Sequence, residues 1–254
     1  MKFSEPLDGG PCWVALSTSD IPAAKSFYAA LFGWRCETDP RAEAGGSTVA
    51  RLGEAAVASL GPVPRTDRSP AWTVFFSTGD TDTTVERVTS AGGTLLAGPM
   101  DVFEQGRSAL VADPEGAVFS LWQPRTFAGA ERLNDPGALG WVELSTRDTV
   151  EALAFYPSVL GWTVNAAESY THWGVDGADF GGMMAMDERF EPEVPPYWLP
   201  YFVVTDVDST AATALSAGGD LLLAPISIPD GPRIAVLRDP QGATFGIHKS
   251  YGED

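Results

Sequence analysis

Two stretches of sequence decide the fold, PCWVALSTSD at residues 11–20 and LGWVELSTRD at residues 139–148. They are offset by 128 residues, and further along the offset becomes 126, between the turns DPEG at 113–116 and DPQG at 239–242. Matches that stay in register over roughly 110 residues identify an internal repeat, which has to be recognised before any local structure is read. The chain is therefore a tandem duplication. We expect domains at residues 11–123 and 139–250, joined by a linker at 124–138.

Each half is predicted to hold two βαβββ units. A β-rich run ending near Thr18 is followed by the cap-like Asp20, by a helix over 21–32 with Pro22 in its first turn, and by Gly33, which ends it. Further strands are expected at 34–37, 48–52, 55–60, 72–77, 94–96, 108–112 and 118–122, with a second helix that begins at Asp80 or Asp82 and ends at Gly92-Gly93. The predicted fold class is α+β, with four βαβββ modules forming curved, mostly antiparallel sheets that carry helices on their outer face.

Alternation along the strands separates two faces, because successive side chains point to opposite sides of a sheet. Val14 and Leu16 suit a helix-covered face, so Trp13, Ala15 and Ser17 lie on the concave face. The same argument gives two further sets of concave-face residues. In the last strand of the first half they are Val118, Ser120 and Trp122, and in the second half they are Trp141, Glu143, Ser145, Thr244, Gly246 and His248.

Composition excludes several classes of function. Acidic residues outnumber basic ones 34 to 16, giving a net charge of −18, so we expect neither nucleic-acid nor membrane partners. The two cysteines are too few for a disulfide framework. The first ten residues lack the apolar core of a signal peptide, which predicts a cytoplasmic protein. We expect a monomer or a homodimer.

The residues W-V-x-L-S-T-x-D, the helix end F-Y-x-x-(L/V)-(F/L)-G-W and the hairpin D-P-x-G-A-x-F resemble the vicinal-oxygen-chelate superfamily, which includes glyoxalase I, bleomycin-resistance proteins and extradiol dioxygenases. The likeness covers nearly the whole chain, and is greatest to tandem actinobacterial members described as glyoxalase-like or hydroxylase. These motifs specify the fold well, but they specify no reaction.

The resemblance implies a divalent metal on the concave sheet, bound by His, Gln or Glu from particular strands. The matching positions are Ala15, Thr73, Ser120 and the region of Ser59 in the first half, and Glu143, Leu199, Gly246 and the Met183-Met184 region in the second. Of these, only Glu143 is a good ligand, and one carboxylate is not a site. We therefore expect no metal or other cofactor. A nonstandard pair of Glu143 with His248 or His172 stays open as an alternative.

The halves differ at the residues of greatest chemical interest. Glu143 stands where the first half has Ala15, His248 stands opposite Trp122, and His172 opposite Thr48. Glu143 and His248 are the candidate catalytic residues, with a hydrogen-bonded structural role as the alternative for each. The candidate ligand-binding residues are Trp141, Ser145, Tyr201, Trp198, Trp173, His172, Met183, Trp13, Trp122 and Phe75, with core packing as the alternative.

Three functions remain open. The first is the metal-free binding of a small apolar or aromatic metabolite, such as an antibiotic or an intermediate of secondary metabolism, mainly in the second half. The second is a glyoxalase-like lyase, isomerase or dioxygenase that uses Glu143 as general base or metal ligand. The third is an interaction protein whose pockets are filled by its own side chains.

Overall fold

We describe a computed structural model of the chain, which covers residues 7–41, 45–63, 69–166, 170–188, 190–229 and 231–249. The first half contains β1 (Pro11–Thr18), α1 (Ile21–Phe32), β2 (Arg35–Thr38), β3 (Thr48–Leu52), β4 (Ala55–Pro62), β5 (Ala71–Ser77), α2 (Thr81–Ser90), β6 (Thr94–Val102), β7 (Gly106–Ala112) and β8 (Val118–Pro124). The second half contains β9 (Leu139–Thr146), α3 (Thr149–Leu160), β10 (Thr163–Ala166), β11 (Thr171–Val175), β12 (Ala178–Ala185), β13 (Tyr197–Val204), α4 (Val207–Ser216), β14 (Asp220–Ser227), β15 (Arg233–Arg238) and β16 (Thr244–Lys249).

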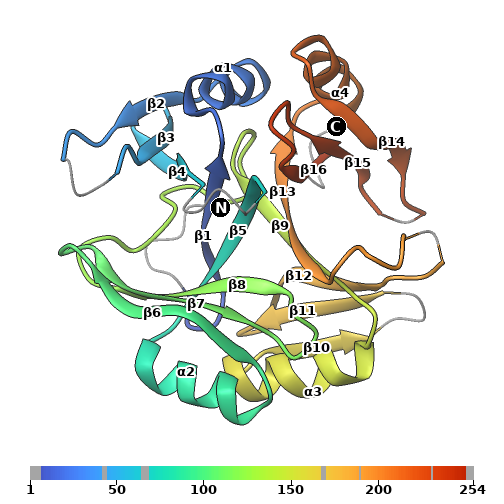
Figure 1. Ribbon diagram of the computed structural model, residues 1–254. Coiled ribbons are helices and arrows are strands. Elements are labelled where there is room, and N and C mark those ends of the chain that lie inside the picture. Colours follow the sequence, from blue (N-terminus) through green and yellow to red (C-terminus); the bar gives the residue numbers. More distant parts are fainter. Residues whose placement is uncertain are drawn as a thin grey trace.

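Each half forms one eight-stranded curved sheet, shown in Figure 1. The strand order is β2-β3-β4-β1-β5-β8-β7-β6 in the first half, and the second half repeats it as β10-β11-β12-β9-β13-β16-β15-β14. The pairs β1–β4, β5–β8, β9–β12 and β13–β16 are parallel and the others antiparallel. The predicted fold class of four βαβββ modules is confirmed.

Local sequence explains where the helices begin and end. Asp20 caps α1 by accepting a hydrogen bond from the amide of Ala23, and Gly33 ends the helix with a φ of 69°, a left-handed conformation that glycine adopts without strain. The bounds of α1 agree with the prediction. Asp80 caps α2, which settles the choice between Asp80 and Asp82. None of the helices described is long and apolar enough to cross a membrane.

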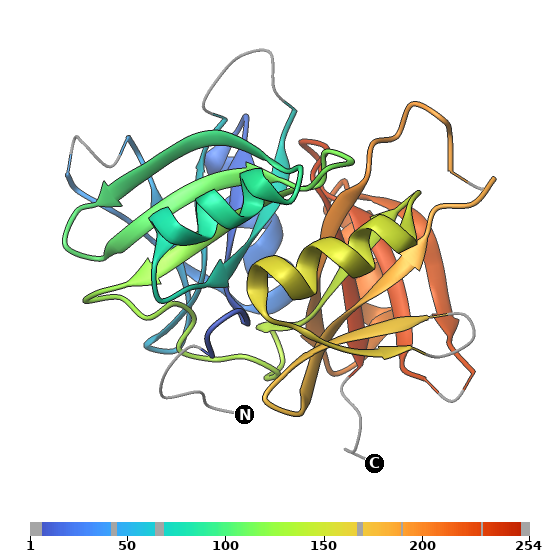
Figure 2. The ribbon, with the colours of Figure 1, turned by 90° about the horizontal axis from the view of Figure 1, so that it is seen from below.

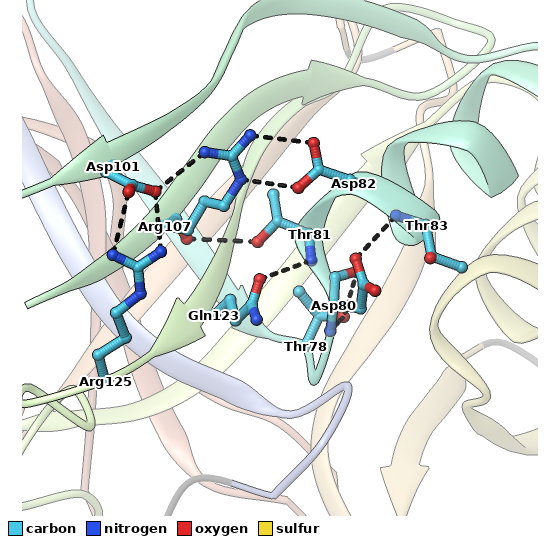
Figure 3. Close-up of polar contacts among 9 residues, drawn as sticks. All are labelled: Thr78, Asp80, Thr81, Asp82, Thr83, Asp101, Arg107, Gln123 and Arg125. Atoms are coloured by element: carbon cyan, nitrogen blue, oxygen red, sulfur yellow. Dashed lines mark hydrogen bonds and ion pairs between the residues drawn. The ribbon is translucent and has the colours of Figure 1, made fainter.

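Arg107 and its repeat partner Arg233 have structural roles. Arg107 bonds Asp82 of α2 through two nitrogens and Asp101 of β6 through a third, and Arg125 also contacts Asp101 (Figure 3). Arg233 bonds Asp208 of α4 in the same way. The carboxylates of these pairs are exposed to solvent, which screens the attraction, so each pair contributes little to stability. Their effect is to fasten a helix to the edge of its sheet.

The helix-covered faces of the two sheets pack against each other. One cluster of buried residues spans both halves, and within it the ring of Phe76 from β5 lies 5.1 Å from that of Trp198 in β13. Figure 1 shows α1 beside α4 at one end of the molecule and α2 beside α3 at the other, and Figure 2 shows the second pair from below. The two concave faces therefore point away from the shared core.

Two buried tyrosines join the halves across this core. Tyr28 of α1 donates to the Oδ2 atom of Asp239 at 3.0 Å and accepts from the indole of Trp72, also at 3.0 Å. Tyr156 of α3 repeats this arrangement with Asp113 and Trp198, at 2.8 and 3.0 Å. Each aspartate also accepts a backbone N–H bond from the alanine that follows its own DPxG turn, Ala117 or Ala243. The recurring turn therefore supplies the acceptor for the helix of the other half.

We expect Tyr28→Phe and Tyr156→Phe each to lower the free energy of unfolding by about 1–3 kcal/mol, because each leaves a buried carboxylate oxygen and a buried indole N–H without a partner. Urea denaturation measures this. Ser26→Ala on the exposed side of α1 is the matched control, and a change within about 0.5 kcal/mol is expected for it. Equal stability of all three variants would contradict the proposed role of the tyrosines.

Candidate functional site

The concave face of the second half carries a carboxylate held between two phenols. Glu143 lies at the middle of β9, between Gly182 of β12 and Leu199 of β13. Its Oε2 atom accepts a hydrogen bond from the Tyr170 hydroxyl at 2.8 Å, and its Oε1 atom accepts one from Tyr201 at 3.2 Å. The Glu143 carboxylate is therefore fixed on the concave face by two hydrogen bonds, as the structural interpretation of this residue expects.

Two glycines make room for these tyrosines. A Cβ at Gly182 would overlap the ring of Tyr170, and a Cβ at Gly246 would overlap the ring of Tyr201. Glycine is required at both positions because the aromatic rings lie directly on the backbone. The Tyr170 hydroxyl also accepts from the indole of Trp141 at 3.0 Å, which extends the chain of hydrogen bonds to Trp141–Tyr170–Glu143–Tyr201.

The protein environment disfavours charge at this site. Burial raises the pKa of the Glu143 carboxyl, and the hydrogen bonds from Tyr170 and Tyr201, which favour the charged form, offset part of that rise. Burial and then the neighbouring charge of Glu143 raise the pKa of the Tyr170 and Tyr201 hydroxyls, so both phenols stay protonated donors. A carboxyl group with a raised pKa can hold or release a proton nearer to neutrality than an exposed one.

The remaining polar residues of this face surround the carboxylate. His172 contacts Asp179 at 3.1 Å and lies edge-on to the ring of Trp141 at 5.6 Å. The hydroxyl of Ser145 is buried beside Tyr197. Burial raises the pKa of the Tyr197 hydroxyl, and the Ser145 hydroxyl offsets part of that rise. The ring of His248 lies 6.4 Å from that of Tyr201, and burial lowers the pKa of His248 to about 4. His248 is therefore neutral at pH 7.

The equivalent face of the first half is filled by its own side chains. Trp13, Phe75 and Trp122 pack with Phe127, which follows β8, and the Trp13 ring meets Phe127 edge-on at 4.9 Å. Trp13 and Trp122 are 7% and 5% exposed, and Phe75 is half-buried. In this half the three candidate residues therefore pack against side chains of the same half.

Three candidate ligand-binding residues of the second half lie in the shared core. Trp173 and Trp198 both contact Tyr156 there, and Met183 is buried in the same core beside Leu144, as its core-packing alternative has it. The placement of the two tryptophans on or near the concave face was wrong, because the shared core takes up large side chains from both sheets. The equivalence of His172 with Thr48 was also wrong. His172 pairs with Gly182 as Val49 pairs with Ser59.

Sequence reasoning missed Tyr170 and Tyr197. Tyr170 precedes β11, and its counterpart in the first half is a serine, so the repeat gives no signal for it. Tyr197 begins β13 two and four residues before Leu199 and Tyr201, and strand alternation alone would have placed it on the concave face.

The residues at the strand positions of the implied metal site do not form a ligand set. In the second half these positions hold Glu143, Gly182, Leu199 and Gly246, and in the first they hold Ala15, Ser59, Thr73 and Ser120. A divalent ion needs three or four protein ligands, or several oxygens. Throughout the described part of the chain, no group of three or more His, Cys, Asp or Glu side chains could hold one. Both oxygens of Glu143 are already bonded to tyrosines.

Comparison with known families agrees with this architecture. Residues 13–122 match the family described as Glyoxalase-like domain, and residues 138–247 match the Glyoxalase/Bleomycin resistance protein/Dioxygenase superfamily. The chain belongs to the vicinal-oxygen-chelate superfamily. This confirms the resemblance on which the fold prediction rested.

Relatives in this superfamily extend over the whole chain. The "Putative glyoxylase CFP32" of Mycobacterium bovis is 39% identical over 257 residues, covering 98% of this chain and 97% of that protein. The "Anthracycline biosynthesis protein DauV" of Streptomyces sp. strain C5 is 35% identical over 257 residues, covering 94% and 92%.

Solved structures of superfamily members share the fold. The Mn(II)-bound glyoxalase from Novosphingobium aromaticivorans has a TM-score of 0.68 at 15% identity, covering 98% of this chain and 84% of that one. The 2,3-dioxygenase LapB from Pseudomonas sp. KL28 has a TM-score of 0.64 at 12% identity, covering 97% and 94%. At such identities the likeness concerns the arrangement of strands and helices, and not the chemistry.

We expect Glu143→Gln to stabilise the protein at pH 7. Because the folded-state pKa of Glu143 is raised, the folded protein binds more protons than the unfolded chain, and wild-type stability falls as pH rises above the unfolded value near 4.3. Glu143→Gln has no carboxyl to ionise, so its stability does not fall in this way as the pH rises. Its Tm should exceed that of the wild type by about 2–4 °C at pH 7, the shift that a gain of ~1 kcal/mol in the free energy of unfolding causes in a chain of this size.

The difference should shrink towards zero as the pH falls well below the unfolded value near 4.3, where the wild-type carboxyl is protonated in both states. Glu86→Gln on the exposed side of α2 is the control for charge removal, and should show no such pH-dependent gain. A lower Tm for Glu143→Gln at pH 7 would show instead that the charged carboxylate stabilises the fold.

Proposed function

We propose that this protein binds a small, flat, apolar or aromatic metabolite without a metal, on the concave face of its second half. The observation that supports it most is the Trp141–Tyr170–Glu143–Tyr201 chain, in which aromatic rings surround one hydrogen-bonding carboxylate. Such faces, largely apolar with a few placed polar groups, are typical of small-molecule sites. At the positions where the superfamily binds metal, the second half has one carboxylate, Glu143, and three residues without a ligating side chain, and this supports the metal-free part of the proposal.

The comparisons support the same class of ligand. Two relatives are named as anthracycline biosynthesis proteins, at 35% identity over nearly the full chain. Anthracyclines are fused aromatic quinones, and a flat ring system gains about 0.5–1.5 kcal/mol per aromatic contact beyond the burial of its area. We infer an antibiotic or an intermediate of its biosynthesis as the ligand.

Quenching of the protein's tryptophan fluorescence tests binding. Addition of anthraquinone or its dihydroxy derivative quinizarin should quench the emission with a dissociation constant in the micromolar range, which corresponds to a binding free energy of about −8 kcal/mol. Trp141→Phe should remove a large part of the quenching, while Trp13→Phe, at the matched position of the filled first half, should not. No quenching by either compound at high micromolar concentration would refute the proposed function.

A second candidate is an isomerase or lyase in which Glu143 is the general base. The raised pKa of this carboxyl and its absence from the first half favour it. Such reactions begin with the removal of a proton next to a carbonyl group, and a placed base contributes about 10²–10⁴-fold to the rate.

Proton NMR in D₂O tests this candidate. Exchange of the methyl protons of acetophenone, an aryl ketone, should be faster with the wild type than with Glu143→Gln by about 10²-fold or more. Glu86→Gln should leave the rate unchanged. Equal rates for the wild type and Glu143→Gln would rule out the carboxylate mechanism, and a metal content near zero in protein purified without chelator would rule out its metal-assisted form.

A further inference from the structure

The linker of the first half places an aromatic ring where a ligand would lie. The ring of Phe127 meets Trp13 edge-on, with 4.9 Å between centroids and an interplanar angle of 90°. Its carbonyl oxygen accepts a hydrogen bond from the Trp122 indole at 3.0 Å. We call residues 125–131 the strap. It is tied down by the bonds Ala130 N–H to Cys12 O at 2.7 Å and Glu131 N–H to Ala56 O at 2.8 Å.

Strand pairing identifies the same positions in the second half. Trp13 lies opposite Phe75 as Trp141 lies opposite Tyr201, so Trp141 is the counterpart of Trp13. Trp122 pairs with Ser77 of β5, and His248 pairs with Val203 of β13, which makes His248 the counterpart of Trp122. In sequence, the residue at the position of Phe127 is Glu253, outside the described residues. Trp13 is buried, whereas Trp141 is half-buried.

His248 has a nitrogen that needs a partner. Its Nε2 atom is buried and lies against Gly140, the counterpart of Cys12, and among the described residues nothing hydrogen bonds to it. Buried polar atoms are nearly always hydrogen bonded, and each one that is not calls for a physical explanation. The equivalent nitrogen in the first half, Nε1 of Trp122, is satisfied by the strap carbonyl.

An open space borders Gly140, the residue against which Nε2 of His248 lies. This cavity at the junction of the halves is lined on one side by Gly140 and Trp141 and by residues 178–180, which are the counterparts of residues 55–57, and His248 stands behind Gly140 rather than in its lining. In the first half the strap covers this region through its bonds to Cys12 and Ala56. The second half therefore offers both an unsatisfied nitrogen and free space where the first half has its strap.

We propose that the ligand of the second half repeats the pose of Phe127, with an aromatic ring edge-on to Trp141 and a phenolic hydroxyl hydrogen bonded to Nε2 of His248. This inference rests on the proposed function and adds the ligand class, a hydroxylated aromatic, and the residue that selects it. The nitrogen of a neutral imidazole is a donor in one tautomer and an acceptor in the other. A phenolic hydroxyl is both donor and acceptor, so it satisfies either tautomer.

Comparison of 2,6-dihydroxyanthraquinone with unsubstituted anthraquinone at pH 6 tests the role of His248, because these hydroxyls lie away from the quinone carbonyls and are free to bond to the protein. Wild-type protein should bind the dihydroxy compound about tenfold more tightly, the ratio expected for one net hydrogen bond. His248→Phe keeps a ring of similar shape without the nitrogen, and should bring this ratio close to one, whatever its effect on the affinity for anthraquinone. Trp122→Phe, the matched substitution in the filled first half, should keep the wild-type ratio. Isothermal titration calorimetry measures all three.

Nitrogen NMR provides a test on the unaltered protein, which has only two histidines. The 2,6-dihydroxyanthraquinone should shift the Nε2 signal of His248, assigned by its absence in His248→Phe or by elimination in His172→Gln, and anthraquinone should shift it much less. Suppose that both compounds bind, but with equal affinity and with the same effect on the Nε2 signal of His248. The inference about His248 is then wrong, while the proposed function stands. If neither compound binds, the proposed function fails, and the inference fails with it.

Discussion

The structure depends on two buried hydrogen bonds, in each of which a tyrosine of one half donates to an aspartate of the other half. The phenol of Tyr28 reaches Asp239, and that of Tyr156 reaches Asp113, so the turn of one sheet is completed by the helix of the other. Burial removes water from both partners, so an arrangement of the sheets that broke either bond would leave two polar groups unsatisfied and would lower stability. The bonds therefore fix the relative placement of the sheets. The aromatic core, the position of the helices and the outward direction of both concave faces follow from this placement.

Both helix-covered faces are used for the shared core, and the two concave faces that point away from it have diverged. The first is closed by Phe127 over Trp13 and Trp122. In the second face, Glu143 stands where the first half has Ala15. Gly182 and Gly246 stand where the first half has Ser59 and Ser120, and the rings of Tyr170 and Tyr201 lie on these glycines. The buried carboxyl is costly for stability, which is the usual sign of a residue kept for something other than folding.

The repeat and the alternation of side chains predicted most of the fold from the sequence. They identified four modules, the bounds of α1 and the faces of Glu143, Trp141 and His248, since these depend on local spacing. They failed for Trp173 and Trp198, because a single sheet gives no indication that a second sheet will bury its aromatic residues. They also failed for Phe127 and Tyr170, which lie outside the strands, where no periodicity shows which way a side chain points. The closed first face could only be seen in three dimensions.

The joining of the two halves in one chain has an evolutionary consequence. If two identical copies of a half met through the same tyrosine–aspartate bonds, every substitution would appear on both faces, and a strap that closed one would close the other. Joined in tandem, the copies can change independently. Ala15 and Glu143, or Trp122 and His248, are then free to differ, so one face can become a rigid support while the other acquires selectivity.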